Sequence, residues 1–256
     1  MPTVESLLAD LAAQHEELDV LLAGCAAADW RRPTPCEGWD VADVVLHLHQ
    51  TDELALASLR GDLESSIEAF MGADEQAVDR AAATSVEAAR GADGVTDGAV
   101  VREQWRTATA ALRARFATTD PSARLQWVVG RLSARTLAAT RLAECWIHTT
   151  DVAAALGIEL APTARLRPIA RLAWRTVPYA FAHGGETLHG PVAFELVAPD
   201  GTDWWFGTDD DPLTVVRGPA HDLCRVAGRR LDSAAAQLAA TGPDADAVLR
   251  LVRTYA

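Results

Sequence analysis

The chain has 256 residues, a formal net charge of −13 at pH 7, and a composition that is 49% hydrophobic and 23% charged. This length favours two domains and this composition is typical of a globular protein, whereas the acidic balance argues against a nucleic-acid partner, which needs clustered positive charge. All 23 basic side chains are arginine, which excludes a Schiff-base lysine, a P-loop lysine and a Ser-Lys mechanism. The sequence has neither a long apolar run nor a signal-peptide pattern, so we expect a cytoplasmic protein without a membrane partner.

Four long helices are predicted in the first part of the chain, over residues 4–27, 41–59, 99–117 and 133–156. Leucines recur at three- and four-residue steps in the first, Asp40 is a plausible N-cap of the second, and Gly157 ends the fourth. Residues 61–100 are predicted to hold a short helix and a mobile loop. Four amphipathic helices with unequal connections favour a helix bundle over residues 1–160.

The character of the sequence changes near residue 160. Two short runs, PVAFELVAP and DWWFGT, flank the turn signal Asp200-Gly201 and predict a hairpin. Residues 219–230, 233–240 and 244–255 are predicted to be helical. We therefore expect a smaller α+β domain over residues 161–256.

The four cysteines, Cys25, Cys36, Cys145 and Cys224, form no C-x-x-C pair. Free and mostly buried thiols are the favoured interpretation, rather than a disulfide framework or a four-thiolate zinc site. Cys36 lies in a predicted loop and is the candidate for a reactive thiol.

A candidate metal site combines His47 with Glu144 and His148. Glu144 and His148 are four residues apart on one helix, so their side chains share a face, and His47 lies midway along another helix. One carboxylate and two imidazoles suit Zn²⁺ first, and also Fe²⁺, Mn²⁺ or Ni²⁺. Three protein ligands leave a coordination position open, as in catalytic sites.

The competing interpretation is a surface ion pair, which is what E-x-x-x-H on a helix usually represents. Here the pair is surrounded by Leu142, Cys145, Trp146 and Ile147, which leaves little room for a solvated face. An unpaired buried Glu and His would cost several kcal/mol, which a bound metal would remove. His49 must point to another side of its helix than His47 and is interpreted as a surface or structural histidine.

Two further side chains lie near the candidate ligands on the same helix. Asp151 follows His148 by three residues and is a candidate acceptor for the imidazole N–H. Arg141 precedes Glu144 by three residues; it could clamp a substrate carboxylate, but a plain ion pair is the favoured alternative. The motifs G-x-S-x-G, G-x-G-x-x-G and G-x-x-x-x-G-K-[ST] are absent, so the usual serine-hydrolase, dinucleotide and triphosphate sites are unsupported.

Two segments resemble signatures of the mycothiol-dependent maleylpyruvate isomerase family. TPCEGWDVADVVLHL resembles its G-W-x-V-x-D-x-x-x-H-L stretch, and RLAECWIHTTDVAAALG resembles its R-x-x-E-x-x-x-H-x-x-D stretch. The resemblance implies that His47, Glu144 and His148 are the metal ligands. It also implies a DinB-like four-helix bundle followed by a small domain similar to sterol-carrier proteins. The C-terminal tail resembles an uncharacterised branch of this family.

The resemblance implies a metal-dependent isomerase or transferase with mycothiol as cosubstrate. The thiolate would add to an activated double bond, and rotation followed by elimination would complete an isomerisation. An arginine of the second domain faces the site in such enzymes, which makes Arg229 the candidate here, with Arg225 as its rival.

Two other functions stay open at this point. One is a thiol-independent metal-dependent tailoring enzyme, such as a lyase, cyclase or hydrolase; the other is a non-catalytic metal- or ligand-binding protein. In each case we expect a small-molecule partner and a monomer or homodimer.

Overall fold

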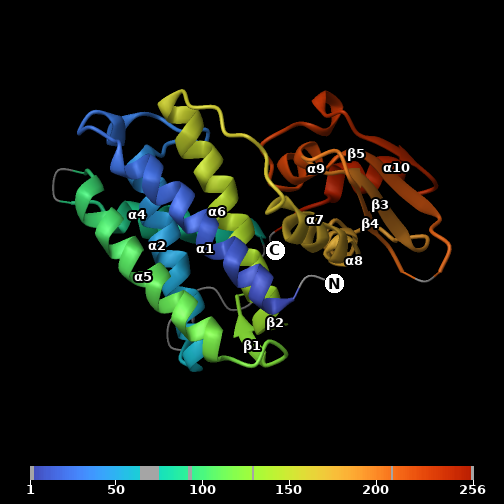
Figure 1. Ribbon diagram of the computed structural model, residues 1–256, viewed down its shortest axis with the longest axis horizontal. Helices are drawn as coiled ribbons and strands as arrows, with labels where there is room; N and C mark the ends of the chain where they lie inside the picture. Colours follow the sequence, from blue (N-terminus) through green and yellow to red (C-terminus); the bar gives the residue numbers. More distant parts are fainter. Residues whose placement is uncertain (1–2, 64–74, 92–93, 129, 209, 255–256) are drawn as a thin grey trace. The chain divides into compact units, whose positions relative to one another are not determined.

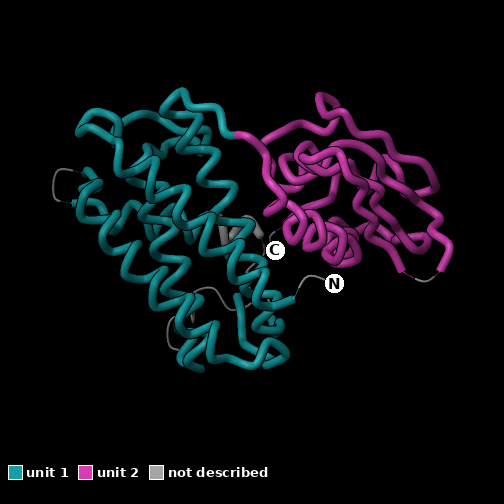
Figure 2. Tube along the Cα trace, viewed as in Figure 1, with its two compact units in different colours: residues 1–160 teal, residues 161–256 magenta. Residues whose placement is uncertain are grey.

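The computed structural model describes residues 3–63, 75–91, 94–128, 130–208 and 210–254. It divides into two compact units, Met1–Leu160 and Ala161–Ala256 (Figure 2). The first is mainly helical and the second combines helices with a small sheet, so the chain has the mixed helical and sheet content expected from its sequence.

Four long helices pack side by side in the first unit: α1 (Val4–Ala23), α2 (Val41–Arg60), α5 (Gly98–Thr118) and α6 (Ala134–Leu156) (Figure 1). Helices α1 and α2 each contact both α5 and α6. The core positions Leu11, Leu18, Leu48, Leu112 and Leu137 are fully buried. These helices confirm the four predicted ones to within a few residues at each end.

The ends of α2 and α6 are fixed by local hydrogen bonds. Asp40 caps α2 by accepting from the Asp43 backbone N–H, and the Asp43 carboxylate accepts from the Asp40 N–H, which completes a capping box. Gly157, with φ of 73°, ends α6 in the left-handed conformation that glycine adopts without strain. The sequence therefore fixes where the two helices that carry the candidate ligands begin or end.

The connections of the first unit hold smaller elements. A 3-10 turn, η1 (Asp29–Arg31), lies between α1 and α2, and α4 (Glu75–Ala89) is the short helix expected in 61–100. Residues 64–74 and 92–93 of the segment that was predicted to hold a mobile loop lie outside the described residues. The hairpin of β1 (Arg124–Trp127) and β2 (Gly130–Ser133) was not predicted, although β2 begins with a glycine whose φ is 119°.

His15 is buried in the first unit, and we expect it to make stability depend on pH. Burial, with the charges of Arg113 on α5 and Arg141 on α6, lowers the pKa of His15 from 6.5 to about 3. Between about pH 3 and pH 6.5, His15 binds a proton in the unfolded chain but not in the native protein. The free energy of unfolding therefore falls as the pH falls through this window. From pH 7 to pH 5 this ring should account for a loss of about 2 kcal/mol.

The comparison that checks this is urea denaturation of the unchanged protein and of His15→Gln at several pH values. Gln keeps an acceptor for the Arg113 guanidinium, which donates to the His15 Nδ1 at 2.8 Å, but it does not titrate. The variant should lose less stability than the unchanged protein on acidification. Parallel curves for the two proteins would contradict the assignment.

The second unit is built on a four-stranded sheet in the order β4-β3-β5-β6. The predicted hairpin is confirmed as β3 (Val192–Val197) and β4 (Asp203–Phe206), while β5 (Thr214–Pro219) runs parallel to β3 and was not predicted. Helices α7 (Leu166–Arg175) and α8 (Val177–His183) precede the sheet, and α7 packs on β3 and β4. Helices α9 (Ala220–Ala227) and α10 (Ala245–Leu251) agree with two of the predicted helices but are shorter.

The helix predicted over residues 233–240 is wrong. Only Ser233–Ala235 forms a 3-10 turn, η2, and Ala239–Thr241 is strand β6, antiparallel to β5. Alanine favours a helix in isolation, but here the hydrogen bonding of residues 239–241 to β5 determines their conformation as a strand. The flanking glycines permit this approach: a Cβ on Gly218 would lie 2.3 Å from the Gln237 carbonyl oxygen, and one on Gly242 would lie 2.1 Å from that of Leu213.

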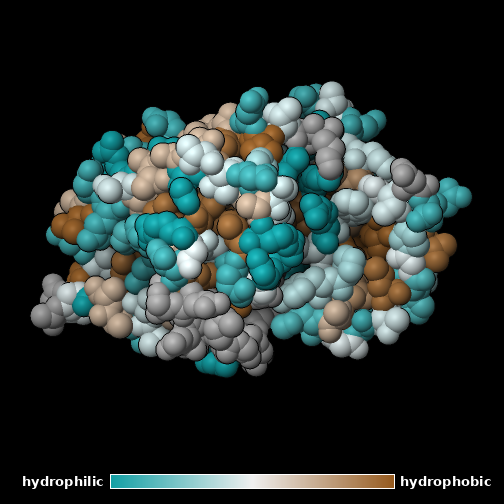
Figure 3. Space-filling view, turned by 90° about the horizontal axis from the view of Figure 1, so that it is seen from below, coloured by the Kyte–Doolittle hydropathy of each residue, from teal (hydrophilic) through white to brown (hydrophobic). Residues whose placement is uncertain are grey.

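Hydrophilic side chains predominate on the face shown in Figure 3, and hydrophobic ones form separate small groups. Within the described ranges, no helix is both long enough and apolar enough to cross a membrane.

Candidate metal centre

The structure brings His47 of α2 together with Glu144 and His148 of α6. The Oε2 of Glu144 lies 3.8 Å from the Nε2 of His47 and 3.8 Å from the Nε2 of His148. One donor atom from each residue fits within 4.8 Å of the others. The side chains are largely buried, with exposed fractions of 12%, 20% and 8% for His47, Glu144 and His148.

These spacings suit a shared cation better than direct hydrogen bonds. A distance of 3.8 Å exceeds the 2.7–3.2 Å typical of N–H···O hydrogen bonds. Two ligands at zinc-bond lengths and tetrahedral angles lie about 3.4 Å apart, which is close to the spacing of Glu144 from each imidazole nitrogen. The donor set, two imidazoles and one carboxylate, is the kind that binds Zn²⁺ and other first-row ions. The residues present therefore fit a divalent metal.

The environment keeps His47 neutral and Glu144 ionised, as metal ligands must be. Burial lowers the pKa of His47, and the contact with Glu144 opposes this only in part. Burial alone would raise the pKa of Glu144, but the contact with His47 and the charges of His148 and Arg141 hold it at about 2. The Trp39 ring lies 5.1 Å from the His47 ring, centroid to centroid, and covers it.

The other nitrogen of His148 is bound to Asp151. The Nδ1 of His148 lies 3.0 Å from the Oδ2 of Asp151, whose side chain is 1% exposed. Burial would lower the pKa of His148, but hydrogen bonds to Asp151 and Cys36 and the charge of Glu144 raise it to about 9. With Nδ1 engaged, the Nε2 that faces Glu144 is the nitrogen that could bind a metal after losing its proton.

Arg141 forms a buried ion pair instead of facing solvent. Its Nε donates to the Oδ1 of Asp52 at 2.8 Å, and both side chains are 2% exposed. Its Nη2 donates to the Thr51 hydroxyl at 2.8 Å, and that hydroxyl donates to the His47 carbonyl at 3.0 Å. Arg141 therefore forms a plain ion pair, which is the alternative favoured from its sequence position, and this pair links α6 to α2.

Arg229 lies in the second unit, directly after α9. It is exposed, adopts φ of 58°, and its Nη1 donates to the Arg250 carbonyl at 3.0 Å. The Nη2 of Arg225 donates to the Arg230 carbonyl at 3.5 Å. The described hydrogen bonds of both arginines are therefore with carbonyls of their own unit.

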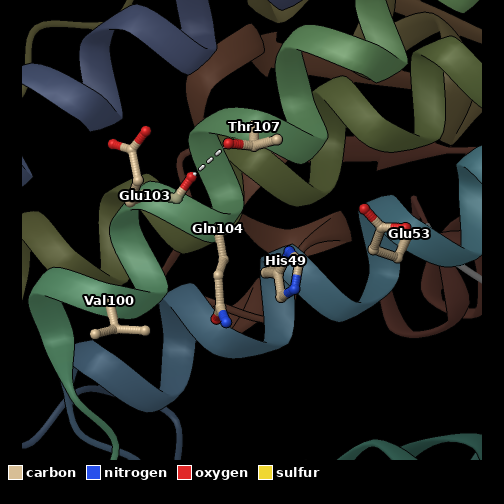
Figure 4. Close-up of a pocket in the computed structure, with 6 residues that line it drawn as sticks. All are labelled: His49, Glu53, Val100, Glu103, Gln104 and Thr107. Atoms are coloured by element: carbon tan, nitrogen blue, oxygen red, sulfur yellow. Dashed lines mark hydrogen bonds between the residues drawn. The ribbon is translucent and has the colours of Figure 1, made fainter.

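His49 lines a separate open pocket of about 460 Å³ between α2 and α5 (Figure 4). Its Nδ1 is buried and has no hydrogen-bond partner in the described part of the chain. Gln104 reaches from α5 toward α2, whereas Glu103 points away from His49. The acidic side chains do not converge with the imidazole, so this pocket offers no set of metal ligands.

Sequence reasoning missed two contributors to the centre. Asp52 was not singled out, although it follows His47 by five residues on the helix and pairs with Arg141. Cys36 was considered only as a reactive loop thiol, but its Sγ lies 3.3 Å from the Oδ2 of Asp151. No periodicity could reveal this second contact, because it joins a loop to a distant helix.

Comparison with known proteins identifies relatives over most of the chain. Residues 11–153 match the family model described as "Mycothiol maleylpyruvate isomerase N-terminal domain". Rv0036c and MT0041, two Mycobacterium tuberculosis proteins described as uncharacterised, are 33% identical over 251 residues, which is 97% of this chain and 95% of each relative.

Two solved structures share the fold. The mycothiol-dependent maleylpyruvate isomerase gives a TM-score of 0.59 at 17% identity, covering 90% of each chain. A histidine-to-alanine mutant of the mycothiol-dependent maleylpyruvate isomerase gives 0.58 at 19% identity, covering 89% of this chain and 90% of the mutant.

Proposed function

Because the chain belongs to the mycothiol maleylpyruvate isomerase family, we propose that it is a metal-dependent enzyme that uses mycothiol to isomerise, or to add a thiol to, a small electrophile. The metal is a divalent ion, with Zn²⁺ as first choice. The fold shared with the isomerase supports a DinB-like first unit and a sterol-carrier-like second unit.

The convergence of the His47, Glu144 and His148 donor atoms carries this proposal. The two imidazoles and the carboxylate come from neighbouring helices and are shielded from bulk water, so a cation would be held by three protein ligands. A divalent ion bound there would supply the positive charge that lowers the pKa of a thiol, so that the thiolate forms near neutral pH.

The chain's own residues have distinct roles in this proposal. Glu144 would provide the negative charge that balances the cation, and the imidazoles of His47 and His148 would complete the set of donor atoms that holds it. Asp151 holds the His148 ring by its Nδ1, and the Trp39 ring excludes water from one side of His47. The thiolate sulfur would bond to one carbon of an activated double bond, rotation about the resulting single bond would follow, and elimination would restore the double bond and release the thiolate.

We expect turnover that requires both a metal and a thiol. Purified protein loaded with Zn²⁺ should isomerise or conjugate members of a panel of small activated cis alkenes, maleylpyruvate included, only when mycothiol is present. Removing the metal with a chelator should lower the rate about 100-fold or more, because electrophilic metals supply several kcal/mol of stabilisation.

His47→Ala should reduce the rate to a similar extent, whereas His49→Ala should leave it nearly unchanged. Thiol-independent turnover that still needs the metal would contradict the proposed use of mycothiol and support a hydrolase, lyase or cyclase. Unchanged turnover in the chelated protein would contradict the role of the metal.

A further inference from the structure

We propose that Cys36 is a positioning residue for the candidate metal centre, acting on His148 through Asp151. This inference rests on the proposed metal site, which it deepens. Cys36 lies in the loop before α2, so this loop would support the metal centre together with the two helices that carry the ligands.

The contacts place the thiol and the imidazole on one carboxylate oxygen. The Oδ2 of Asp151 accepts from the Cys36 thiol at 3.3 Å and from the His148 Nδ1 at 3.0 Å. The Sγ and the Nδ1 are themselves 3.9 Å apart. Because a carboxylate oxygen has two lone pairs, it can accept from both donors at once. The thiol therefore restrains the Asp151 oxygen that orients His148.

Cys36 lies on the opposite side of the His148 ring from the other ligands. Glu144 faces the Nε2, whereas Asp151 and Cys36 face the Nδ1. The thiol is thus not placed to share an ion with His47 and Glu144. Its effect on that ion must pass through Asp151 and the imidazole.

The loop holds the thiol in place by its own hydrogen bonds. The Cys36 N–H donates to the Thr34 hydroxyl at 3.2 Å, and the Cys36 carbonyl accepts from the Trp39 N–H at 3.0 Å. Trp39 in turn covers the His47 ring. The segment 34–39 therefore contacts both ligand histidines, one through Trp39 and the other through Cys36 and Asp151.

A second metal ion bound by Cys36, Asp151 and the His148 Nδ1 is the alternative arrangement of the same atoms. It would require one imidazole to serve two ions. The hydrogen-bonded arrangement needs only the protons that the thiol and the ring carry, so we favour positioning.

The test is the Zn²⁺ affinity of the full-length protein, measured by competition with a chromophoric chelator. Cys36→Ala should weaken Zn²⁺ binding about 10-fold, since residues that orient metal-bound histidines typically contribute 10–100-fold. Cys36→Ser keeps a donor and should retain affinity within about 3-fold of the unchanged protein. Cys25→Ala is the matched control, because its thiol donates to the Leu21 carbonyl in the same connection, and should have no effect.

A double-mutant cycle tests the route through Asp151. In an Asp151→Asn background, Cys36→Ala should change affinity less than about 3-fold, because the acceptor that transmits the effect is altered. Additive losses would overturn the inference, as would equal affinity of Cys36→Ala and the unchanged protein.

Cobalt substitution separates positioning from ligation. Co²⁺ bound to the unchanged protein should show ligand-field absorption that shifts in Cys36→Ala, without a thiolate charge-transfer band. A charge-transfer band that disappears in Cys36→Ala, or two Zn²⁺ per chain, would overturn the inference. Absence of Zn²⁺ binding to the unchanged protein would overturn both this inference and the proposed metal site, whereas normal binding in Cys36→Ala overturns this inference alone.

Discussion

His148→Ala is expected to remove stoichiometric Zn²⁺ from the purified protein. The substitution deletes one of three ligands and leaves Glu144 and Asp151 without the imidazole that both contact. Zinc sites with four protein ligands bind with about 10–16 kcal/mol, so one ligand is worth on the order of 3 kcal/mol, or about 100-fold in affinity. Metal analysis of the dialysed protein and chelator competition measure this loss.

His49→Ala is the matched control for this experiment. His49 lies two residues from His47 on the same helix but lines the pocket between α2 and α5. Its replacement should leave the metal content unchanged, while His47→Ala and Glu144→Ala should behave like His148→Ala. An equal loss of metal from His49→Ala, or full metal content in His148→Ala, would contradict the assignment.

Arg141→Met is expected to destabilise the protein by about 3–5 kcal/mol. Asp52 would then be a buried carboxylate without its cationic partner, in a place where burial already raises its pKa despite Arg141. Urea denaturation followed by circular dichroism measures the change. Because the pair joins α2 to α6, the variant should also bind Zn²⁺ more weakly than the unchanged protein.

A compensating double variant, and a variant that breaks an exposed ion pair, show whether the unpaired buried charge of Asp52 causes the loss of stability. Arg141→Met combined with Asp52→Leu removes both charges and should recover most of the lost stability. Arg60→Met breaks the exposed ion pair of Arg60 and Asp62, in which the two side chains are 50% and 64% exposed. This substitution should lower the free energy of unfolding by less than about 1 kcal/mol. The interpretation fails if the double variant is no more stable than Arg141→Met.

The parts of the fold that could be predicted are those set by local signals. Asp40 and Asp43 placed the start of α2, and Gly157 placed the end of α6. Strand β6 could not be predicted, because its residues adopt that conformation through pairing with β5, which overrides the helical preference of alanine. The β1–β2 hairpin was missed although the alternation up to Trp127 and the glycine at position 130 were available signals.

The candidate site also has parts that local sequence signals predict and parts that depend on the packing of distant segments. The i,i+4 spacing of Glu144 and His148 predicted one shared helix face, the convergence of bundle helices made His47 a candidate partner, and the family resemblance implied all three as ligands. The ion pair of Arg141 with Asp52 required the packing of α2 on α6 to be known. The place of Cys36 depends on the path of the loop before α2, which no residue spacing specifies.

Every donor atom of the candidate metal centre belongs to the first unit, and the matched family model, residues 11–153, also ends within it. The ligand set is therefore encoded in one contiguous stretch of the gene. Substitutions in residues 161–256, or exchange of that segment by recombination, would leave the metal ligands intact.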